Sequence, residues 1–334
     1  MANNLILSIK ICSFSYARVI INLRMNKKRS EPVRHHYIPQ FIIKNFAKDE
    51  LNFVNYYDKK RKKILTQPTE EVFKYNNLYR DEVNTPDDPT KIETDFAKYE
   101  QEMSEVINGK LLRGDEIELT VEENESLLLF LTLLELRSKS TYKIFVELAK
   151  DESQKNNIYA QYQEDGDYVA LWRRNLGFAV QCRSVNQVFL NPNIDYIFKF
   201  YLRQGAFGIA GRFLIIVESR GGEDFFLCDG YPLNLQAETS FGFNAPMMTF
   251  FPISPNRMII SACFGVKAAR EDIRIFQKSF FSAPYKSHSG GYIFKVKKIY
   301  TREIEFLNDG MFNFSKEGLA FKETNRFFVV DRNS

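Results

Sequence analysis

Apolar and polar positions in the first third of the chain alternate in patterns that predict a short β-hairpin followed by helices. Residues 52–57 and 63–67 have the alternation of strands, and the basic stretch between them predicts a turn. Apolar side chains recur every three or four positions over 92–112, which predicts an amphipathic helix. Thr120 and Glu123 resemble a capping box, and the helix predicted after them is apolar almost all round, as a central core helix would be.

The second half of the chain has more strand-like patterns. Short apolar runs bounded by Gly, Pro and Asn predict strands at residues 213–218, 224–228, 247–252 and 257–262. Further helices are expected at residues 142–163 and 268–282. These elements together predict an α+β fold, with a central helical segment flanked by a short N-terminal β-hairpin and a C-terminal mixed or antiparallel sheet.

The order of these elements predicts a single α+β domain over residues 31–334. Its helical part is expected at about 90–205 and its strand-rich part at about 206–334. Residues 1–30 are expected to form a poorly ordered N-terminal extension, because a second methionine, Met25, begins a polar, basic stretch.

Charge and cysteine usage narrow the class of protein. The net charge of +4 arises from 46 basic and 42 acidic residues, so the field is mixed, and the basic cluster at 59–63 is local. Such a cluster could contact nucleic-acid phosphates, although a basic hairpin turn is more often a solvated tip. The four cysteines are too far apart to hold zinc and indicate reduced thiols. We therefore expect a cytoplasmic protein without a membrane partner, and the sequence does not set its oligomeric state.

Two adjacent histidines, His35 and His36, are the most informative feature, because the chain has three histidines in all. Histidine titrates near neutrality and can act as a general acid, a general base or a ligand. Pro39 keeps a helix from running through the pair, and neighbouring side chains in an extended chain point to opposite faces. The two rings are therefore expected to have different roles, one of them structural, and a metal held by both is disfavoured.

Charged residues elsewhere could complete a site with this pair. Glu93 and Glu100 lie seven residues apart, so both project from similar sides of one helix, where they hold a divalent cation or form a solvated face. Arg137 follows the apolar helix and either binds an anion or caps the helix end. Asp229 follows a buried strand on a Gly/Pro turn, where it serves a site or bonds the turn backbone.

The histidines and these charged residues are expected to line one cleft. His35, His36, Glu100, Arg137 and Asp229 are the candidate catalytic residues. The candidate ligands for a divalent cation such as Mg²⁺ are Glu93, Glu100 and Asp229, and the candidate substrate-binding residues are Tyr37, Gln40 and Ser254. The chain lacks phosphate-loop, dinucleotide, HExxH and GxSxG motifs, so no nucleotide cofactor is expected.

The segment HHYIPQFIIKNF at residues 35–46 resembles the opening signature, approximately HHYxPQFxLxxF, of bacterial domain-of-unknown-function family 4238. FFLCDGYPL at 225–233 and FFPISP at 250–255 are similar to later segments of that family and follow in the same order. Gly230 stands where the family usually has asparagine. The resemblance spans residues 34 to about 282 and implies a shared fold and cleft, not an activity.

Two functions fit these features. The first is hydrolysis of a phosphodiester, as in a nuclease-like toxin or anti-phage effector, with histidine as acid or base, carboxylates around a cation and Arg137 stabilising charge. The second is a binding or regulatory module in which the same residues form a buried polar network. A site open to solvent, with His35 or His36 close to Glu93, Glu100 or Asp229, would favour the first.

Overall fold

The computed structural model confirms the predicted α+β class. It describes residues 34–48, 50–150, 167–195, 198–199, 213–220, 222–238, 244–262, 271, 284–286 and 290–323. The prediction for residues 1–30 and the helix predicted at 268–282 fall almost entirely outside this part of the chain. Among the described helices, none combines the length and apolar character needed to cross a membrane.

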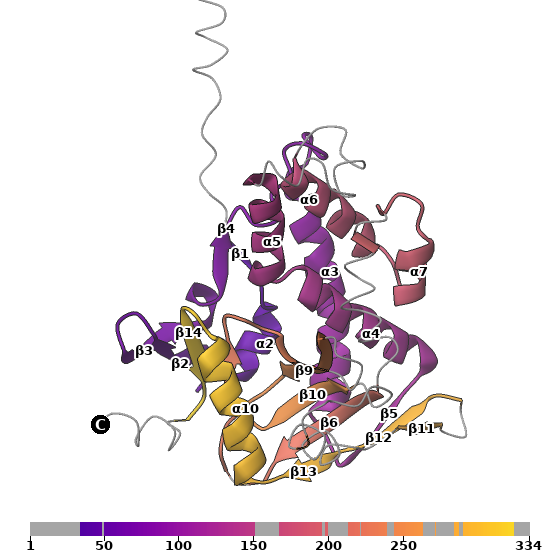
Figure 1. Cartoon of the computed structure of the whole chain (residues 1–334). Helices are drawn as coiled ribbons and strands as arrows, with labels where there is room; N and C mark the ends of the chain where they lie inside the picture. The colour runs from indigo at the N-terminus through magenta and orange to yellow at the C-terminus, as the bar shows by residue number, and fades with distance from the viewer. Residues whose placement is uncertain are drawn as a thin grey trace, which may run out of the picture. The chain divides into compact units, whose positions relative to one another are not determined.

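Most of the described helices lie in the middle of the chain, between residues 91 and 190, and one helix lies toward each end of the described part (Figure 1). They are α2 (Gln40–Asn45), α3 (Lys91–Val106), α4 (Val121–Leu136), α5 (Lys139–Lys150), α6 (Tyr168–Ala179), α7 (Val185–Leu190) and α10 (Thr301–Phe314), with a 3₁₀ turn η1 (Thr69–Glu71). The helix predicted over 92–112 ends differently from the expectation, because its last turn is the π-helical η2 (Ile107–Leu111). The capping box at Thr120 and Glu123 is confirmed.

The strands of the described residues form four sheets. A two-stranded sheet pairs β1 (Arg34–His36) with β4 (Lys74–Asn76). The largest has the order β13-β6-β10-β9-β8, with β6 (Phe213–Ser219), β8 (Leu233–Glu238), β9 (Asn244–Pro252), β10 (Arg257–Ala262) and β13 (Lys297–Ile299). It is mixed, because β13 runs parallel to β6 and the other pairs are antiparallel.

Two smaller sheets join segments that are distant in sequence. One has the order β11-β12-β5, from Tyr285–Lys286, Tyr292–Lys295 and Glu116–Leu119. The other has the order β3-β2-β14-β7, from Lys63–Pro68, Phe53–Asp58, Gly318–Phe321 and Leu227–Cys228. The predicted hairpin is confirmed as β2–β3, whereas the strand predicted at 224–228 is only the two-residue β7.

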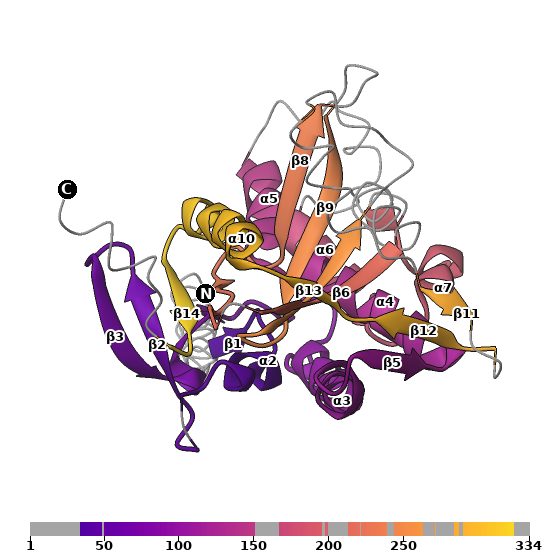
Figure 2. The same cartoon turned by 90° about the horizontal axis from the view of Figure 1, so that it is seen from below.

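The largest sheet has an apolar layer on each face. On β6, Ile215 and Val217 pack with α10, through Ile304 and Leu307, whereas Leu214 and Ile216 belong to the core formed with the central helices. Figure 2 shows α10 on one side of this sheet and α4 and α6 on the other. Because both faces are covered, β6 and β10 are nearly continuous apolar runs rather than alternating ones.

Strand β14 completes the N-terminal hairpin sheet from the other end of the chain. Gly318 pairs with Asp58, and a Cβ atom at Gly318 would lie 2.3 Å from the Tyr56 ring, so only glycine allows this approach. The segment before it, residues 315–317, is thereby brought next to the hairpin turn, where Lys59 N–H donates to the Glu317 carbonyl at 3.0 Å.

Candidate functional site

The paired histidines lie on β1, and Pro39 separates this strand from α2. Pro39 has an extended backbone conformation, and the helix starts at Gln40 immediately after it. Ile42 and Ile43 are buried in the core and anchor α2. The histidine strand is therefore held at a fixed place next to the helical core.

Arg137, directly after α4, is the centre of a buried polar cluster. Its Nη1 pairs with the Glu100 carboxylate, its Nη2 donates to the His36 carbonyl at 2.8 Å, and its Nε donates to the Tyr79 hydroxyl at 3.0 Å. The guanidinium carbon lies 4.1 Å from the centre of the Phe96 ring, and the side chain is 2% exposed. Arg137 thus joins β1, α3 and α4, with all three guanidinium nitrogens engaged.

His35 is buried beneath Tyr79. Its Nδ1 accepts the Tyr79 backbone N–H at 2.9 Å, and the two rings are stacked with centres 5.5 Å apart. Burial, followed by the nearby charges of Arg173 and Arg137, lowers the pKa of His35 to about 4, so the ring is neutral at pH 7. Because Nδ1 is an acceptor, we assign the proton to Nε2, a buried atom without a hydrogen-bonding partner among the described residues.

His36 has a different set of neighbours, although its ring is neutral as well. Burial, followed by the charges of Lys74 and Arg137, lowers the pKa of His36 to about 4, against an opposing contribution from backbone hydrogen bonding at Glu70 and Thr69. Its Nε2 is also buried and unpartnered within the described part of the chain. Neither histidine therefore supplies an imidazolium acid near neutral pH.

Glu93, in the first turn of α3, is the group of this cluster that titrates near neutrality. Burial raises its pKa to about 7; the charge of Arg137 opposes the shift and that of Glu100 adds to it. Its Oε2 is buried, with no hydrogen-bonding partner in the residues described. The seven-residue spacing thus places two carboxyls near Arg137, of which Glu100 forms the ion pair and Glu93 has the raised pKa.

Asp229 lies in a second cluster, where its carboxylate closes a turn. It accepts the Ser315 hydroxyl and the backbone N–H groups of Lys316 at 3.0 Å, Glu317 at 3.1 Å and Gly318 at 3.4 Å. These bonds fix the connection between α10 and β14, so Asp229 stabilises a distant segment and not the backbone of its own Gly/Pro turn. The structure does not bring Asp229 together with Glu93 and Glu100, and the described residues contain no group of three or more potential metal ligands.

Tyr37 faces this second cluster. Its ring centre lies 5.9 Å from the Lys139 ammonium, and Lys139 pairs with Glu317. Burial, followed by the charge of Asp229, raises the pKa of Tyr37. Gln40, the first residue of α2, is half-buried. Of the predicted substrate-binding residues, Tyr37 therefore links the Asp229 turn to the strand that carries the histidines.

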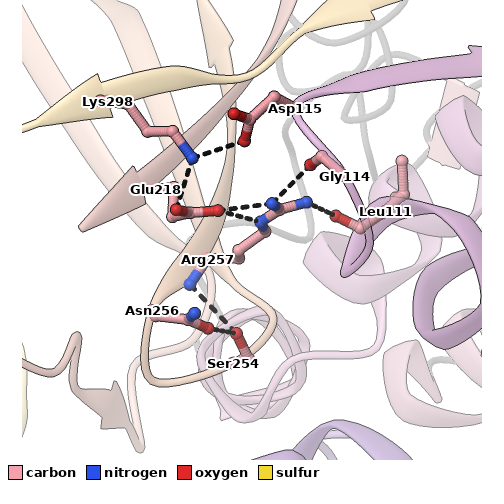
Figure 3. Close-up of polar contacts among 8 residues, drawn as sticks. All are labelled: Leu111, Gly114, Asp115, Glu218, Ser254, Asn256, Arg257 and Lys298. Atoms are coloured by element: carbon pink, nitrogen blue, oxygen red, sulfur yellow. Dashed lines mark hydrogen bonds and ion pairs between the residues drawn. The ribbon is translucent and has the colours of Figure 1, made fainter. Parts of the chain in front are cut away.

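Ser254 lies in a separate turn before β10. Its hydroxyl donates to Asn256 Oδ1 at 2.8 Å and accepts the Arg257 N–H at 3.0 Å, so it stabilises the turn (Figure 3). The Arg257 side chain binds the Leu111 and Gly114 carbonyls at 2.7 and 2.6 Å and pairs with Glu218, which Lys298 also contacts. This second buried arginine ties the sheet to the end of η2, away from the Arg137 cluster.

Sequence reasoning missed several residues around the histidines. Tyr79, which bonds both His35 and Arg137, lies in an irregular segment without periodicity. The cations Lys74, Arg80 and Arg173, whose charges act on the histidines, carry no local signal of this role. They reach the histidines through tertiary contacts, such as the pairing of β1 with β4 and the bonds from Arg173 to the Asn77 and Leu78 carbonyls, which no local pattern predicts.

Comparison with known proteins identifies a family whose function is unknown. Residues 34–325 match a family described as "Protein of unknown function (DUF4238)", a range that includes the expected 34–282 and continues through β14. No curated protein and no solved structure matches the chain.

Proposed function

Because the chain belongs to the DUF4238 family of proteins of unknown function, which assigns no chemistry, we propose from the site itself that it hydrolyses phosphodiesters, with Glu93 as the proton-transfer group. The observation that carries this proposal is a half-buried carboxyl with a pKa of about 7 and a buried, unpartnered oxygen. General acid–base catalysis is most effective when the pKa of the catalytic group lies near the working pH.

The charges around the histidines favour an anionic substrate. Burial is the main cause of the lowered histidine pKa values, and Arg173 and Arg137 at His35 and Lys74 at His36 add to it, so cations act on both rings. The neutral His35 ring offers an Nε2–H donor that has no partner in the described protein. A phosphoryl oxygen that reached this donor would satisfy it and would be attracted by the neighbouring cations.

The proposed step uses the residues as follows. The Glu93 carboxylate takes a proton from water, and the resulting hydroxide oxygen forms a bond to phosphorus. The ester P–O bond breaks, the leaving oxygen takes a proton from solvent, and Glu93 returns its proton to solvent. Arg137 acts as a positioning residue, because its donors already hold Glu100, Tyr79 and the His36 carbonyl.

A second candidate function is a binding module in which this cluster is only structural. The near-complete burial of Arg137 and His35 favours it, because a catalytic group needs access to its substrate. Glu93 distinguishes the catalytic function from the binding module. A carboxyl with a raised pKa and an unpartnered oxygen weakens a purely structural network, so its presence favours the catalytic function.

The test is the pH dependence of hydrolysis of bis(p-nitrophenyl) phosphate by the purified full-length chain. Because the Glu93 pKa is raised to about 7, its basic form accumulates above that pH, and we expect kcat/KM to rise through about pH 7 and then level off. Absence of nitrophenol release across the pH range, or a rate independent of pH between about 6 and 8, would refute the proposed function.

A further inference from the structure

A compact group of cations surrounds the turn of the β2–β3 hairpin. Residues 58–63 and 315–318 contain six basic and two acidic residues, a local charge of +4 that equals the net charge of the whole chain. Five of these cations are exposed, and we call them the basic tip: Lys60, Arg61, Lys62, Lys63 and Lys316. The register of β14 on β2 places Lys316 next to the turn, although it is more than two hundred residues away in sequence.

The basic tip is held on a fixed support. Lys59, within the turn, donates from Nζ to the carbonyls of Phe312 and Ser315 at 2.7 and 2.8 Å, and so caps the C-terminal end of α10. The same ammonium lies 4.4 Å from the centre of the Phe312 ring. Because Lys59 anchors the turn, the exposed cations beside it are presented from a defined position.

An exposed aromatic residue lies close in sequence to one of these cations. Phe314, two residues before Lys316, is 47% exposed. It also lies against Gly230, where a Cβ atom would be 2.6 Å from the phenyl ring, so the glycine allows the ring to pack on the backbone. Exposed cations next to a ring supported on one side are the combination that binds single-stranded nucleic acid, through phosphates and base stacking.

A series of contacts also connects the basic tip to the candidate site. Glu317, which follows Lys316, pairs with Lys139, and Lys139 lies two residues beyond Arg137. The Lys139 ammonium faces Tyr37, the residue after His36. A chain of direct contacts thus leads from the basic tip to the segment that carries the histidines.

We propose that the basic tip and Phe314 bind single-stranded nucleic acid and that this polymer is the substrate class of the site. The binding itself stands on the surface described above, whereas its role as substrate rests on the proposed phosphodiesterase function. A hairpin turn that is merely solvated does not account for the additional cation Lys316, in the segment before β14, or for the exposed ring of Phe314. An anionic membrane surface is the main competing partner, because it also attracts cations flanking an aromatic ring.

The experiment measures fluorescence anisotropy of a labelled single-stranded oligonucleotide with the full chain at several salt concentrations. The tip variant combines Lys60→Gln, Arg61→Gln, Lys62→Gln and Lys316→Gln. The matched control removes four exposed charges elsewhere, with Lys98→Gln, Lys143→Gln, Lys150→Gln and Arg302→Gln. All eight side chains are exposed, so both variants should fold, which circular dichroism checks.

We expect the tip variant to bind at least about tenfold more weakly and its slope of log affinity against log salt to be shallower by about 3. Phe314→Ala should weaken binding about tenfold with little change in slope, because stacking is not electrostatic. Equal losses in the tip and control variants would overturn the proposal. Binding to phosphatidylserine vesicles without binding to the oligonucleotide would overturn it as well.

The small chromogenic diester separates this inference from the proposed function. The tip variant should hydrolyse bis(p-nitrophenyl) phosphate at the wild-type rate, because the proposed reaction uses Glu93 and none of the four substituted residues. If oligonucleotide binding depends on the basic tip but the wild-type chain cleaves neither diester nor oligonucleotide, the binding surface stands and the phosphodiesterase function, with the substrate role, fails.

Discussion

Replacing Arg137 with methionine is expected to lower the free energy of unfolding by about 3–5 kcal/mol, because it leaves a partly buried charge and several buried acceptors without their donor. Glu100 would lose its ion-pair partner, and the His36 carbonyl and the Tyr79 hydroxyl would lose their donors. Urea denaturation at pH 7 measures the loss through the transition midpoint and slope. Arg137→Lys should restore little, since one ammonium cannot reproduce three directed contacts.

A double-mutant cycle with Glu100→Gln provides the control for Arg137. If the two residues act as a pair, the double variant should lose less stability than the sum of the two single variants. Additive losses, or a loss below about 1 kcal/mol in Arg137→Met, would show that the cluster does not hold β1 to α3 and α4.

Glu93→Gln is expected to lower the rate of diester hydrolysis by about 10²- to 10⁴-fold, because glutamine keeps the shape of the side chain but cannot transfer the proton. The control is Glu102→Gln on the same helix, where the carboxylate is exposed and pairs with Arg183. Loss in the first variant and not in the second would assign the effect to Glu93. Similar rates in both variants would remove Glu93 from the reaction.

The same substitution should stabilise the fold at pH 8. The Glu93 pKa is raised in the folded state to about 7 from its ordinary value of 4.5, so its ionisation makes stability fall as pH rises from about 4.5 to about 7. Glutamine removes this cost, so Glu93→Gln should unfold at higher urea than wild type at pH 8 and show no such gain at pH 5. A loss of stability at pH 8 would contradict the raised pKa.

The histidines should give stability the opposite pH dependence. Their folded pKa values of about 4 lie below the ordinary 6.5, so protonation favours the unfolded chain, and stability is lost as pH falls from about 6.5 to about 4. This part of the profile should be unchanged in Glu93→Gln, which lets the same denaturation curves separate the two contributions.

Elements with local signals could be predicted from the sequence, and those that depend on distant partners could not. The β2–β3 hairpin and the capped start of α4 carry their own turn and cap residues. Helix α10 has Gly310 in its interior and no Ser, Thr, Asp or Asn at its N-cap position, which is Tyr300. Strand β14 is four residues long and is defined by its pairing with β2 and β7.

The same distinction applies to the candidate site. Helical spacing placed Glu93 and Glu100 on similar sides of one helix, because periodicity determines which side chains share a helix face. The pairing of Arg137 with Glu100 joins two different helices and was only one of the two roles expected for this arginine. The position of Asp229 depended on a loop almost ninety residues later in the chain, which no local pattern connects to it. The predicted acid–base role of the histidines also depended on burial and on distant cations, which lower their pKa values.

The most direct test of the account is the titration of the Glu93 side-chain carboxyl in the folded protein, followed by NMR with Glu93→Gln to assign the resonance. We predict a midpoint at about pH 7, far above the ordinary value for glutamate. A midpoint below about 5 would mean that Glu93 is ionised throughout the neutral range, and the proposed proton transfer would have no group to perform it.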